Sequence, residues 1–344
     1  MSFRRNLDCF FSSLLRFLRN DKIVFKNLLD KIRIPFKTKL RFLRNDKSLL
    51  KKIIMKKLTL ILLLIISFSG NAQTVTEPKN NPKEWSQPYE PFRIVGNLYY
   101  VGTYDLASYL IVTNKGNILI NTGLADSYPQ IKASIEKLGF KYKDTKILTL
   151  TQAHFDHMGA MADIRKETGA KLYVDEADVA ELKSGGKSDY ELGKYGVTFK
   201  PLSPDFLLKN NGKIKLGKTT LTLLHHPGHT KGSCSFIFET KDENGKYKVL
   251  IANMPSIIID HKFSDVKAYP TIQKDYAYTL DAMKKLDFDV WVASHASQFD
   301  LHKKRKEGNA YNPKLYMDKE NYFKRLKDLE DDYLEKVKEE SQTK

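Results

Sequence analysis

The sequence predicts one α/β domain in which two packed sheets are covered by helices. Short apolar runs alternate with amphipathic stretches between residues 93 and 300, and histidine-containing segments follow several of these runs. Alternating strands and helices favour a layered α/β architecture. A chain of 344 residues could form one large or two small domains. Because no linker-like segment interrupts residues 93–300, we expect a single domain there.

The first half of this region has clear strand and helix patterns. Period-two or continuous apolar runs predict strands, and apolar residues three to four positions apart predict helices. The segment Asn114-Lys115-Gly116 has the composition of a hairpin turn. The expected strands are 98–101, 109–113, 117–121, 146–150 and 171–174, and the expected helices are 128–138, 160–167 and 176–183.

The second half repeats these patterns. The expected strands are 213–216, 219–224, 235–239, 246–252 and 290–293, and the expected helices are 272–286 and 318–339. Residues 74–92 are polar and rich in proline and asparagine, so we expect an extended arm that lies on the body of the domain.

The charge of the chain is concentrated at its N-terminus. The formal net charge is +17, but residues 1–54 contain 15 Lys/Arg and 4 Asp/Glu, and Lys56 and Lys57 add two further positive charges. Residues 73–344 therefore carry 17 − 13 = +4. A basic surface for nucleic acid is not supported, and no nucleic-acid partner is expected.

Residues 55–72 have the pattern of a secretory signal peptide. Met55-Lys56-Lys57 precedes an apolar core at 58–68, and small or polar residues at 69–72 suit signal peptidase. The alternative is a buried anchor helix, although the core is short for a membrane span. No cysteine follows Ala72, so we expect cleavage before Gln73, a periplasmic protein and no stable membrane anchor after cleavage.

Residues 1–54 form a basic leader with an internal repeat. The seven residues at 16–22 recur at 41–47, which is too little for a repeat architecture. A basic amphipathic segment on a membrane surface is one interpretation. The interpretation we favour is that Met55 is the true start and that the leader is not part of the mature protein, because a signal peptide works at the N-terminus.

Cysteine contributes little to the expected mature domain. Of Cys9 and Cys234, only Cys234 lies beyond the expected cleavage site, so no internal disulfide can form there. Cys234 begins an alternating strand-like run, which favours a buried structural thiol over a nucleophile.

The segment 151–157 concentrates possible metal ligands. Gln152, His154, Asp156 and His157 follow the expected strand 146–150, so their side chains would project from a loop held by a sheet. Imidazole and carboxylate suit Zn²⁺, and a zinc-bound water with a pKa near 7 makes hydroxide available at neutral pH. This pattern indicates a zinc hydrolase rather than a set of surface histidines.

Two distal histidines also follow expected strands. Pro227-Gly228 forces a turn that presents His229, and His295 follows the apolar run 290–293. For His225 and His226 we expect roles behind the ligands or in the core rather than metal binding. His261 and His302 lie in polar contexts and are expected at the surface.

Taken together, the patterns Q-x-H-x-D-H, H-H-P-G-H-T-x-G-S and A-S-H resemble the metallo-β-lactamase superfamily. Within it they resemble the third subclass of class B β-lactamases, and the glutamine and the segments 102–123 and 252–256 resemble the GOB-type enzymes. The resemblance covers residues 73–344. It implies an αβ/βα sandwich of four layers and zinc-dependent hydrolysis of penicillins, cephalosporins and carbapenems, which are small-molecule β-lactam substrates.

The resemblance also implies a site. Gln152, His154 and His229 match one metal position, and Asp156, His157 and His295 match a second, so one or two Zn²⁺ ions are expected. Zinc-bound hydroxide would attack the lactam carbonyl. Asp156 would bind metal and orient this nucleophile.

Three departures qualify the match. A neutral amide, Gln152, replaces the usual histidine and is the poorer zinc donor. Asn121 replaces an aspartate, and Met254 falls where related enzymes have serine or cysteine. Ser256 matches a serine that holds the substrate carboxylate, with a simple turn serine as the alternative.

Other functions remain open. Lactonases and thioester hydrolases share the fold, and fold alone does not give the substrate. Those relatives place an aspartate after the strand corresponding to 249–252, where this chain has Asn253-Met254-Pro255-Ser256. A secreted module with a purely structural zinc is the other alternative, although structural sites favour cysteine-rich ligand sets.

Overall fold

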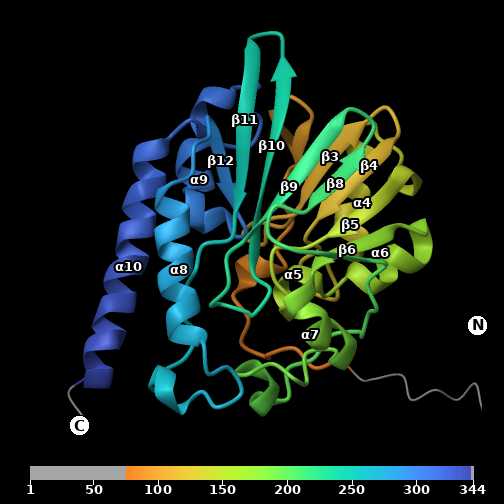
Figure 1. The fold of residues 1–344 in the computed structure, drawn as a ribbon. Helices are drawn as coiled ribbons and strands as arrows, with labels where there is room; N and C mark the ends of the chain where they lie inside the picture. Colours follow the sequence, from red (N-terminus) through yellow and green to blue (C-terminus); the bar gives the residue numbers. More distant parts are fainter. Residues whose placement is uncertain (1–74, 342–344) are drawn as a thin grey trace, which may run out of the picture. The chain divides into compact units, whose positions relative to one another are not determined.

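A computed structural model describes residues 75–341, which belong to one compact unit. The predictions for residues 1–72 lie outside the described residues. The described part contains two sheets that face each other, each covered by helices on its outer side (Figure 1).

The first sheet has seven strands in the order β1 to β7. Strands β1 to β4 pair antiparallel and β4 to β7 pair parallel. The strands are β1 (Phe92–Val95), β2 (Leu98–Tyr100), β3 (Tyr109–Thr113), β4 (Gly116–Ile120), β5 (Thr145–Thr149), β6 (Lys171–Asp175) and β7 (Phe206–Leu208).

The second sheet has five strands in the order β12-β11-β10-β9-β8. Only β11 and β12 pair parallel in this sheet. Its strands are β8 (Lys213–Leu216), β9 (Thr219–His225), β10 (Cys234–Asp242), β11 (Gly245–Ala252) and β12 (Val290–Ala293). All four residues of β12 are buried, as expected for a strand covered on both faces.

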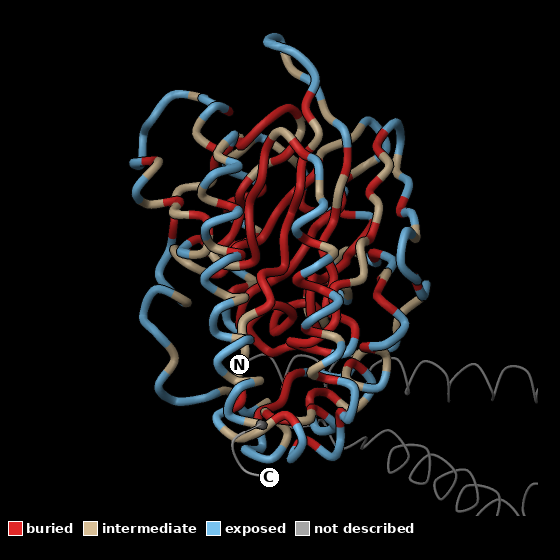
Figure 2. The backbone as a smooth tube through the Cα atoms, turned by 60° about the vertical axis from the view of Figure 1, so that its left-hand side comes forward, coloured by how far each residue is buried: buried red, intermediate tan, exposed pale blue. Residues whose placement is uncertain are grey.

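Helices form the two outer layers. In Figure 1, α4 (Tyr128–Lys137) and α6 (Met161–Thr168) lie beside the first sheet, and α8 (Ile272–Lys284) and α10 (Lys319–Ser341) lie beside the second. One apolar cluster joins the two sheets and continues under α8 and α10, and another lies between the first sheet and its helices. The buried tube segments of Figure 2 are concentrated in these layers. The predicted four-layer αβ/βα arrangement is confirmed.

Shorter helices complete the described chain. These are α5 (Phe155–Met158), α7 (Val179–Ser184) and α9 (Leu301–Lys304), with 3₁₀ turns η1 (Lys83–Trp85), η2 (Tyr142–Asp144), η3 (Glu176–Asp178), η4 (Leu192–Tyr195), η5 (Phe263–Asp265), η6 (Ala296–Phe299) and η7 (Pro313–Tyr316). Between residues 75 and 341 no helix combines the length and hydrophobicity needed to cross a membrane.

Most predicted elements are present with ends shifted by one to three residues. Three strands, β3, β8 and β12, begin and end at the predicted residues. The turn at Asn114-Lys115-Gly116 joins β3 to β4 as expected. The sequence prediction missed β1, β7, α5 and α9, and the segment 151–157, expected to be a loop, enters α5 at Phe155. The prediction also treated 176–183 as one helix, where the structure has η3 followed by α7.

The polar segment before β1 does lie on the body. Two hydrogen bonds join Thr76 to Thr198: Thr76 N donates to the side-chain Oγ1 of Thr198 at 2.9 Å, and Thr198 N donates to Thr76 O at 2.8 Å. Glu77 Oε1 accepts a hydrogen bond from Ala125 N at 2.8 Å. We call residues 75–91 the N-terminal arm.

Candidate metal centre

The candidate ligands lie just beyond the carboxyl ends of strands from both sheets. After β5, residues 150–154 lead into α5, which carries Asp156 and His157. His295 follows β12 after one residue, and it forms an isolated β-bridge to Leu106, which lies in the connection between β2 and β3. Parallel strands place their carboxyl ends at one edge, so side chains distant in sequence meet there.

His229 depends on a glycine turn after β9. Gly228 has φ +131°, and a Cβ atom on it would lie 2.8 Å from Cδ1 of Tyr276. A side chain at this position would therefore be strained and would clash with a buried ring. Only glycine fits this turn without displacing Tyr276, which explains why the chain can direct His229 toward the candidate site.

Asp156, His157 and His295 form one cluster. One ligand atom from each lies within 4.8 Å of the others. Oδ2 of Asp156 is 3.2 Å from Nε2 of His157 and 3.4 Å from Nε2 of His295. Burial would raise the pKa of Asp156, but the two imidazoles outweigh it and hold this pKa well below its usual range. The cluster therefore offers one anionic and two imidazole donors.

The environment of His157 fits a metal ion. This side chain is fully buried, and neither Nδ1 nor Nε2 has a hydrogen-bond partner of acceptable geometry among the described residues. Burial lowers its pKa, which favours the neutral imidazole. An unsatisfied buried nitrogen is costly, and a metal bond at Nε2 would remove that cost.

His154 and His229 form a second pair. Their ring centroids are 4.9 Å apart, and both side chains are buried. Gln152 precedes them on the same loop and is 4% exposed. Its side-chain amide has no hydrogen-bond partner among residues 75–341, so the amide oxygen is available as a ligand. This set offers two imidazoles and one neutral oxygen.

Three of these imidazoles have one nitrogen held by an oxygen atom. His154 Nε2 lies 3.0 Å from Asp189 Oδ2, His229 Nδ1 lies 2.7 Å from Ser256 O, and His295 Nδ1 lies 3.1 Å from Asp105 Oδ2. Each contact leaves the other ring nitrogen available, which is the usual arrangement behind metal-binding histidines.

These acidic partners also set the charge around the rings. Burial opposes protonation of His154, but the carboxylate of Asp189 outweighs it and raises the pKa of His154 to about 9. Burial would raise the pKa of the Asp105 carboxyl, but His295 outweighs this effect and lowers that pKa to about 2. The sequence analysis identified neither Asp105 nor Asp189, which were missed because they lie 190 and 35 positions from their histidines.

Asp178 connects two ligand-bearing loops. Its Oδ2 accepts hydrogen bonds from Ala153 N at 3.0 Å and Thr230 Oγ1 at 2.9 Å, and its Oδ1 accepts one from Gly232 N at 2.6 Å. Ala153 separates Gln152 from His154, and Thr230 follows His229. This buried carboxylate, also missed in the sequence analysis, therefore fixes the two loops relative to each other.

Asn121 has a similar structural role. It is buried, with φ +59°, and its Oδ1 accepts the backbone N–H of Thr151 at 2.9 Å while its Nδ2 donates to Thr151 Oγ1 at 3.0 Å. Thr151 immediately precedes Gln152. The neutral amide thus holds the start of the ligand loop without adding charge.

The remaining histidines do not join the two ligand sets. His225 Nδ1 contacts Asp175, and buried His226 contacts Ser235, which agrees with supporting or core roles. His261 is partly exposed. His302 is likewise partly exposed, and its ring stacks on Tyr104 with ring centroids 3.6 Å apart. A tyrosine 198 positions away provides this contact, which local polarity could not reveal.

The other singled-out residues occupy defined places. Ser256 lies at the site, where its carbonyl oxygen accepts from His229 and from Tyr276 Oη at 2.9 Å, and its Oγ is 3.3 Å from His229 Nδ1. Met254 is buried in the core between the sheets. Cys234 is also buried, and burial raises the pKa of its thiol, so the prediction of a structural thiol is confirmed.

Comparison with solved structures gives the family. The crystal structure of the metallo-β-lactamase GOB-18 from Elizabethkingia meningoseptica is 74% identical, with a TM-score of 0.77 over 78% of this chain and 100% of that one. The chain belongs to the metallo-β-lactamase superfamily. Within it, the chain is a GOB-type member of subclass B3. Residues 103–242 match the family described as the metallo-beta-lactamase superfamily.

Other structures of this superfamily agree. The class B3 di-zinc metallo-β-lactamase LRA-12 from an Alaskan soil metagenome is 59% identical, with a TM-score of 0.75 over 76% of this chain and 99% of that one. A β-lactamase from Chitinophaga pinensis is 51% identical, with a TM-score of 0.75 over 77% of this chain and 100% of that one. The fold is therefore the metallo-β-lactamase fold.

Curated relatives within the superfamily are more distant. A probable metallo-hydrolase of Methanocaldococcus jannaschii is 29% identical over 136 residues, which is 40% of this chain and 64% of that protein. A hydroxyacylglutathione hydrolase of Haemophilus influenzae is 27% identical over 123 residues, which is 35% of this chain and 57% of that protein. The chain thus spans less than two-thirds of the length of these curated relatives.

Proposed function

We propose that this protein is a zinc-dependent β-lactamase that opens the β-lactam ring of penicillins, cephalosporins and carbapenems. The observation that carries the proposal is the pair of ligand sets at one edge of a subclass B3 fold, Gln152/His154/His229 and Asp156/His157/His295. Both sets consist of the donors that suit zinc.

The two sets would hold one or two Zn²⁺ ions. When bound, zinc supplies a Lewis acid that activates water at neutral pH and stabilises developing negative charge. The unsatisfied nitrogens of buried His157 and the ionised carboxylate of Asp156 are the features of this chain that fit such an ion. The charge of Asp156 contributes to the raised pKa of His154, whose main opposing causes are burial and Asp189, and this supports one continuous site.

The protein's own groups perform the remaining work. Asp156 stays ionised, so it can bind metal and orient the attacking water. Asp189, Asp105 and the carbonyl of Ser256 fix three imidazole rings, which reduces the reorganisation needed during the reaction. Asp189 is buried, while Asp105 and Ser256 are partly exposed, and partial exclusion of water strengthens the electrostatic interactions of these groups. We assign Ser256 Oγ to the substrate carboxylate, because it is the hydroxyl adjacent to His229.

A lactonase or thioester hydrolase is the alternative function. The distant similarity to a hydroxyacylglutathione hydrolase keeps it open. The segment Asn253-Met254-Pro255-Ser256 provides no acid at the end of β11, and Met254 is buried in the core. Because those relatives use an aspartate there, this segment favours the β-lactamase.

We further propose that the protein acts in the periplasm, as the signal-peptide pattern of residues 55–72 indicates. The mature chain would then meet antibiotics before they reach their targets. Its partners would be small-molecule β-lactams, without nucleic acid or a stable membrane anchor.

The test is a comparison of substrates, metal content and one matched pair of variants. The zinc-loaded protein is assayed with nitrocefin, a carbapenem, a lactone and a thioester, before and after treatment with a chelator. We expect β-lactam turnover that a chelator removes and Zn²⁺ restores. Asp156→Asn should abolish turnover, whereas Asp144→Asn, an exposed change on η2, should leave it unaltered. Faster turnover of the lactone or the thioester would instead support the alternative.

A further inference from the structure

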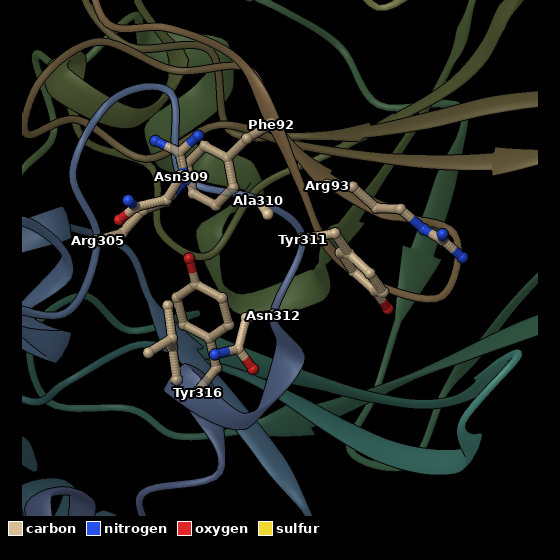
Figure 3. A pocket seen from close by; sticks show the side chains of 9 residues that line it. Phe92, Arg93, Arg305, Asn309, Ala310, Tyr311, Asn312 and Tyr316 are labelled. Atoms are coloured by element: carbon tan, nitrogen blue, oxygen red, sulfur yellow. The ribbon is translucent and has the colours of Figure 1, made fainter.

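A second cavity lies apart from the candidate metal centre. It is formed where β1 meets the chain segment between α9 and η7, and its volume is about 80 Å³. None of the proposed zinc ligands lines it. Its lining includes two arginines, two asparagines and three aromatic residues: Arg93, Arg305, Asn309, Asn312, Phe92, Tyr311 and Tyr316 (Figure 3).

Arg305 is a buried cation without a matching anion. It is only 6% exposed, and its guanidinium carbon lies 4.0 Å from the centroid of the Phe92 ring. Its one recorded side-chain hydrogen bond goes to the neutral hydroxyl of Tyr89, at 3.4 Å. No carboxylate in the described part of the chain makes an ion pair with it. A buried charge is costly unless it is paired, so an anionic partner would stabilise this guanidinium.

Tyr316 supplies an independent observation. This residue is 2% exposed, and its hydroxyl has no hydrogen-bond partner among the described residues. In Figure 3 the hydroxyl points into the cavity, toward the ring of Phe92 over which the guanidinium lies. Burial raises the pKa of Tyr316, and Arg305 is close enough to oppose that shift. The hydroxyl therefore remains protonated and can donate a hydrogen bond.

The two asparagines add further donors. Oδ1 of Asn309 accepts from Lys306 N at 2.7 Å, and Oδ1 of Asn312 accepts from Lys314 N at 3.2 Å. Each of these oxygens thus already has one partner, while no hydrogen bond from the amide N–H groups is made within residues 75–341.

The other polar groups of the cavity already have partners. Arg93 donates to Gly96 O and pairs with Glu243, and the Tyr311 hydroxyl bonds Asp242 and Gly96 N. The polar groups left free are therefore donors, two of them on nearly buried side chains.

We propose that this cavity binds a small oxyanion, either a carboxylate group or an inorganic oxyanion. The planar guanidinium of Arg305 would bind two of its oxygens, and Tyr316 would donate to it. A cavity of this volume has room for about five to eight water molecules, since one water needs roughly 10–15 Å³. It therefore suits an ion of the size of acetate or phosphate rather than a β-lactam, and the proposal does not depend on the protein's catalytic activity.

The test measures anion binding by the zinc-loaded protein at constant ionic strength. Sodium acetate, phosphate or sulfate replaces sodium chloride, and binding is followed by calorimetry and by the thermal midpoint of unfolding. We expect saturable binding by the wild-type protein. Arg305→Met should weaken it by at least about tenfold, as expected when a charged hydrogen-bond partner is lost. Tyr316→Phe should weaken it by about threefold or more on the same grounds.

Controls separate this site from others. Lys314→Met removes one exposed positive charge beside the cavity and should leave the affinity unchanged. Anion binding at zinc would persist in Arg305→Met, so equal affinities of wild type and this variant overturn the proposal. Crystals soaked in acetate or in selenate should show density for the anion between Arg305 and Tyr316, anomalous in the case of selenium, and the stronger ligand identifies the carboxylate or the inorganic source. The proposal is also overturned if anion density appears only at the zinc ligands, or if the change in thermal midpoint depends on ionic strength alone.

Discussion

The carboxylate of Asp105 joins the N-terminal arm to a proposed metal ligand: its Oδ2 lies 3.1 Å from His295 Nδ1 and accepts a hydrogen bond from Trp85 Nε1 at 3.2 Å. Its other oxygen accepts a hydrogen bond from Ser297 N at 2.8 Å. The Trp85 ring also packs on the His295 ring, with centroids 5.5 Å apart. His295 is thus held in place from two sides.

Asp105→Asn should weaken zinc binding at the Asp156 set. The amide removes the charge that orients His295, and loss of such a partner costs about 10- to 100-fold in metal affinity. The measurement is a zinc titration against a competing chelator, with Asp144→Asn as the matched control. Trp85→Phe should give a smaller loss because it removes the hydrogen bond but keeps ring packing. Unchanged zinc affinity in Asp105→Asn would refute the role assigned to this carboxylate.

Asp178→Asn should lower the free energy of unfolding. The carboxylate accepts three hydrogen bonds, and an amide group would leave at least one buried donor facing another donor. We expect a loss of about 1–3 kcal/mol, the usual cost of an unsatisfied buried group. Chemical denaturation of the metal-depleted protein measures this directly and separates it from metal binding. Equal stability of variant and wild type would show that the two ligand loops are held by other contacts.

At limiting zinc, the Asp156 set should fill first. Its carboxylate offsets part of the metal charge, whereas Gln152 offers only a neutral oxygen. Metal stoichiometry combined with a crystal structure at substoichiometric zinc tests the order. Zinc bound at His154 and His229 with the Asp156 set empty would mean that surrounding groups such as Asp189 outweigh ligand charge.

Gln152→His should tighten the weaker set and promote binding of two zinc ions. An imidazole replaces the poorer amide donor at a position that is already buried. Competition titrations should resolve a higher second affinity in the variant than in the wild type. Gln130→His, a change on α4 that lies outside both ligand sets, controls for the added imidazole itself.

A gene that begins at Met55 should yield a protein that is exported, cleaved near Ala72 and as active as the product of the full sequence. The reason is that the charged start and apolar core of a signal peptide would then lie at the N-terminus. N-terminal sequencing of the periplasmic protein decides the matter. Recovery of a mature chain that retains residues 1–54 would contradict it.

Sequence patterns predict much of this fold because its strands are strongly apolar. The runs that form β3 and β12 have the predicted bounds because they are apolar and mostly buried, whereas β8 does because polar and apolar residues alternate along it. Strand β7 was missed because two of its three residues, Phe206 and Leu207, are exposed at a sheet edge. A three-residue edge strand has too little periodicity to be recognised locally.

The candidate ligands could be predicted because their spacing is itself a chemical signal. Asp105, Asp178 and Asp189 could not, because each acts through a partner that tertiary packing supplies. Nothing in the local sequence distinguishes Asp105 from the exposed acids of the same chain. Likewise the burial of Arg305 became visible only when β1 and the segment after α9 were seen together.

The attachment of the N-terminal arm has a practical consequence for protein production. Residues 76 and 77 are hydrogen-bonded to the body, and the charge of Asp156 contributes to the raised pKa of Glu77, whose main cause is burial. A polyhistidine purification tag fused just ahead of this arm would add imidazoles next to a segment whose Glu77 lies within electrostatic range of Asp156. Metal counts should therefore be made on material purified without such a tag, or after its proteolytic removal.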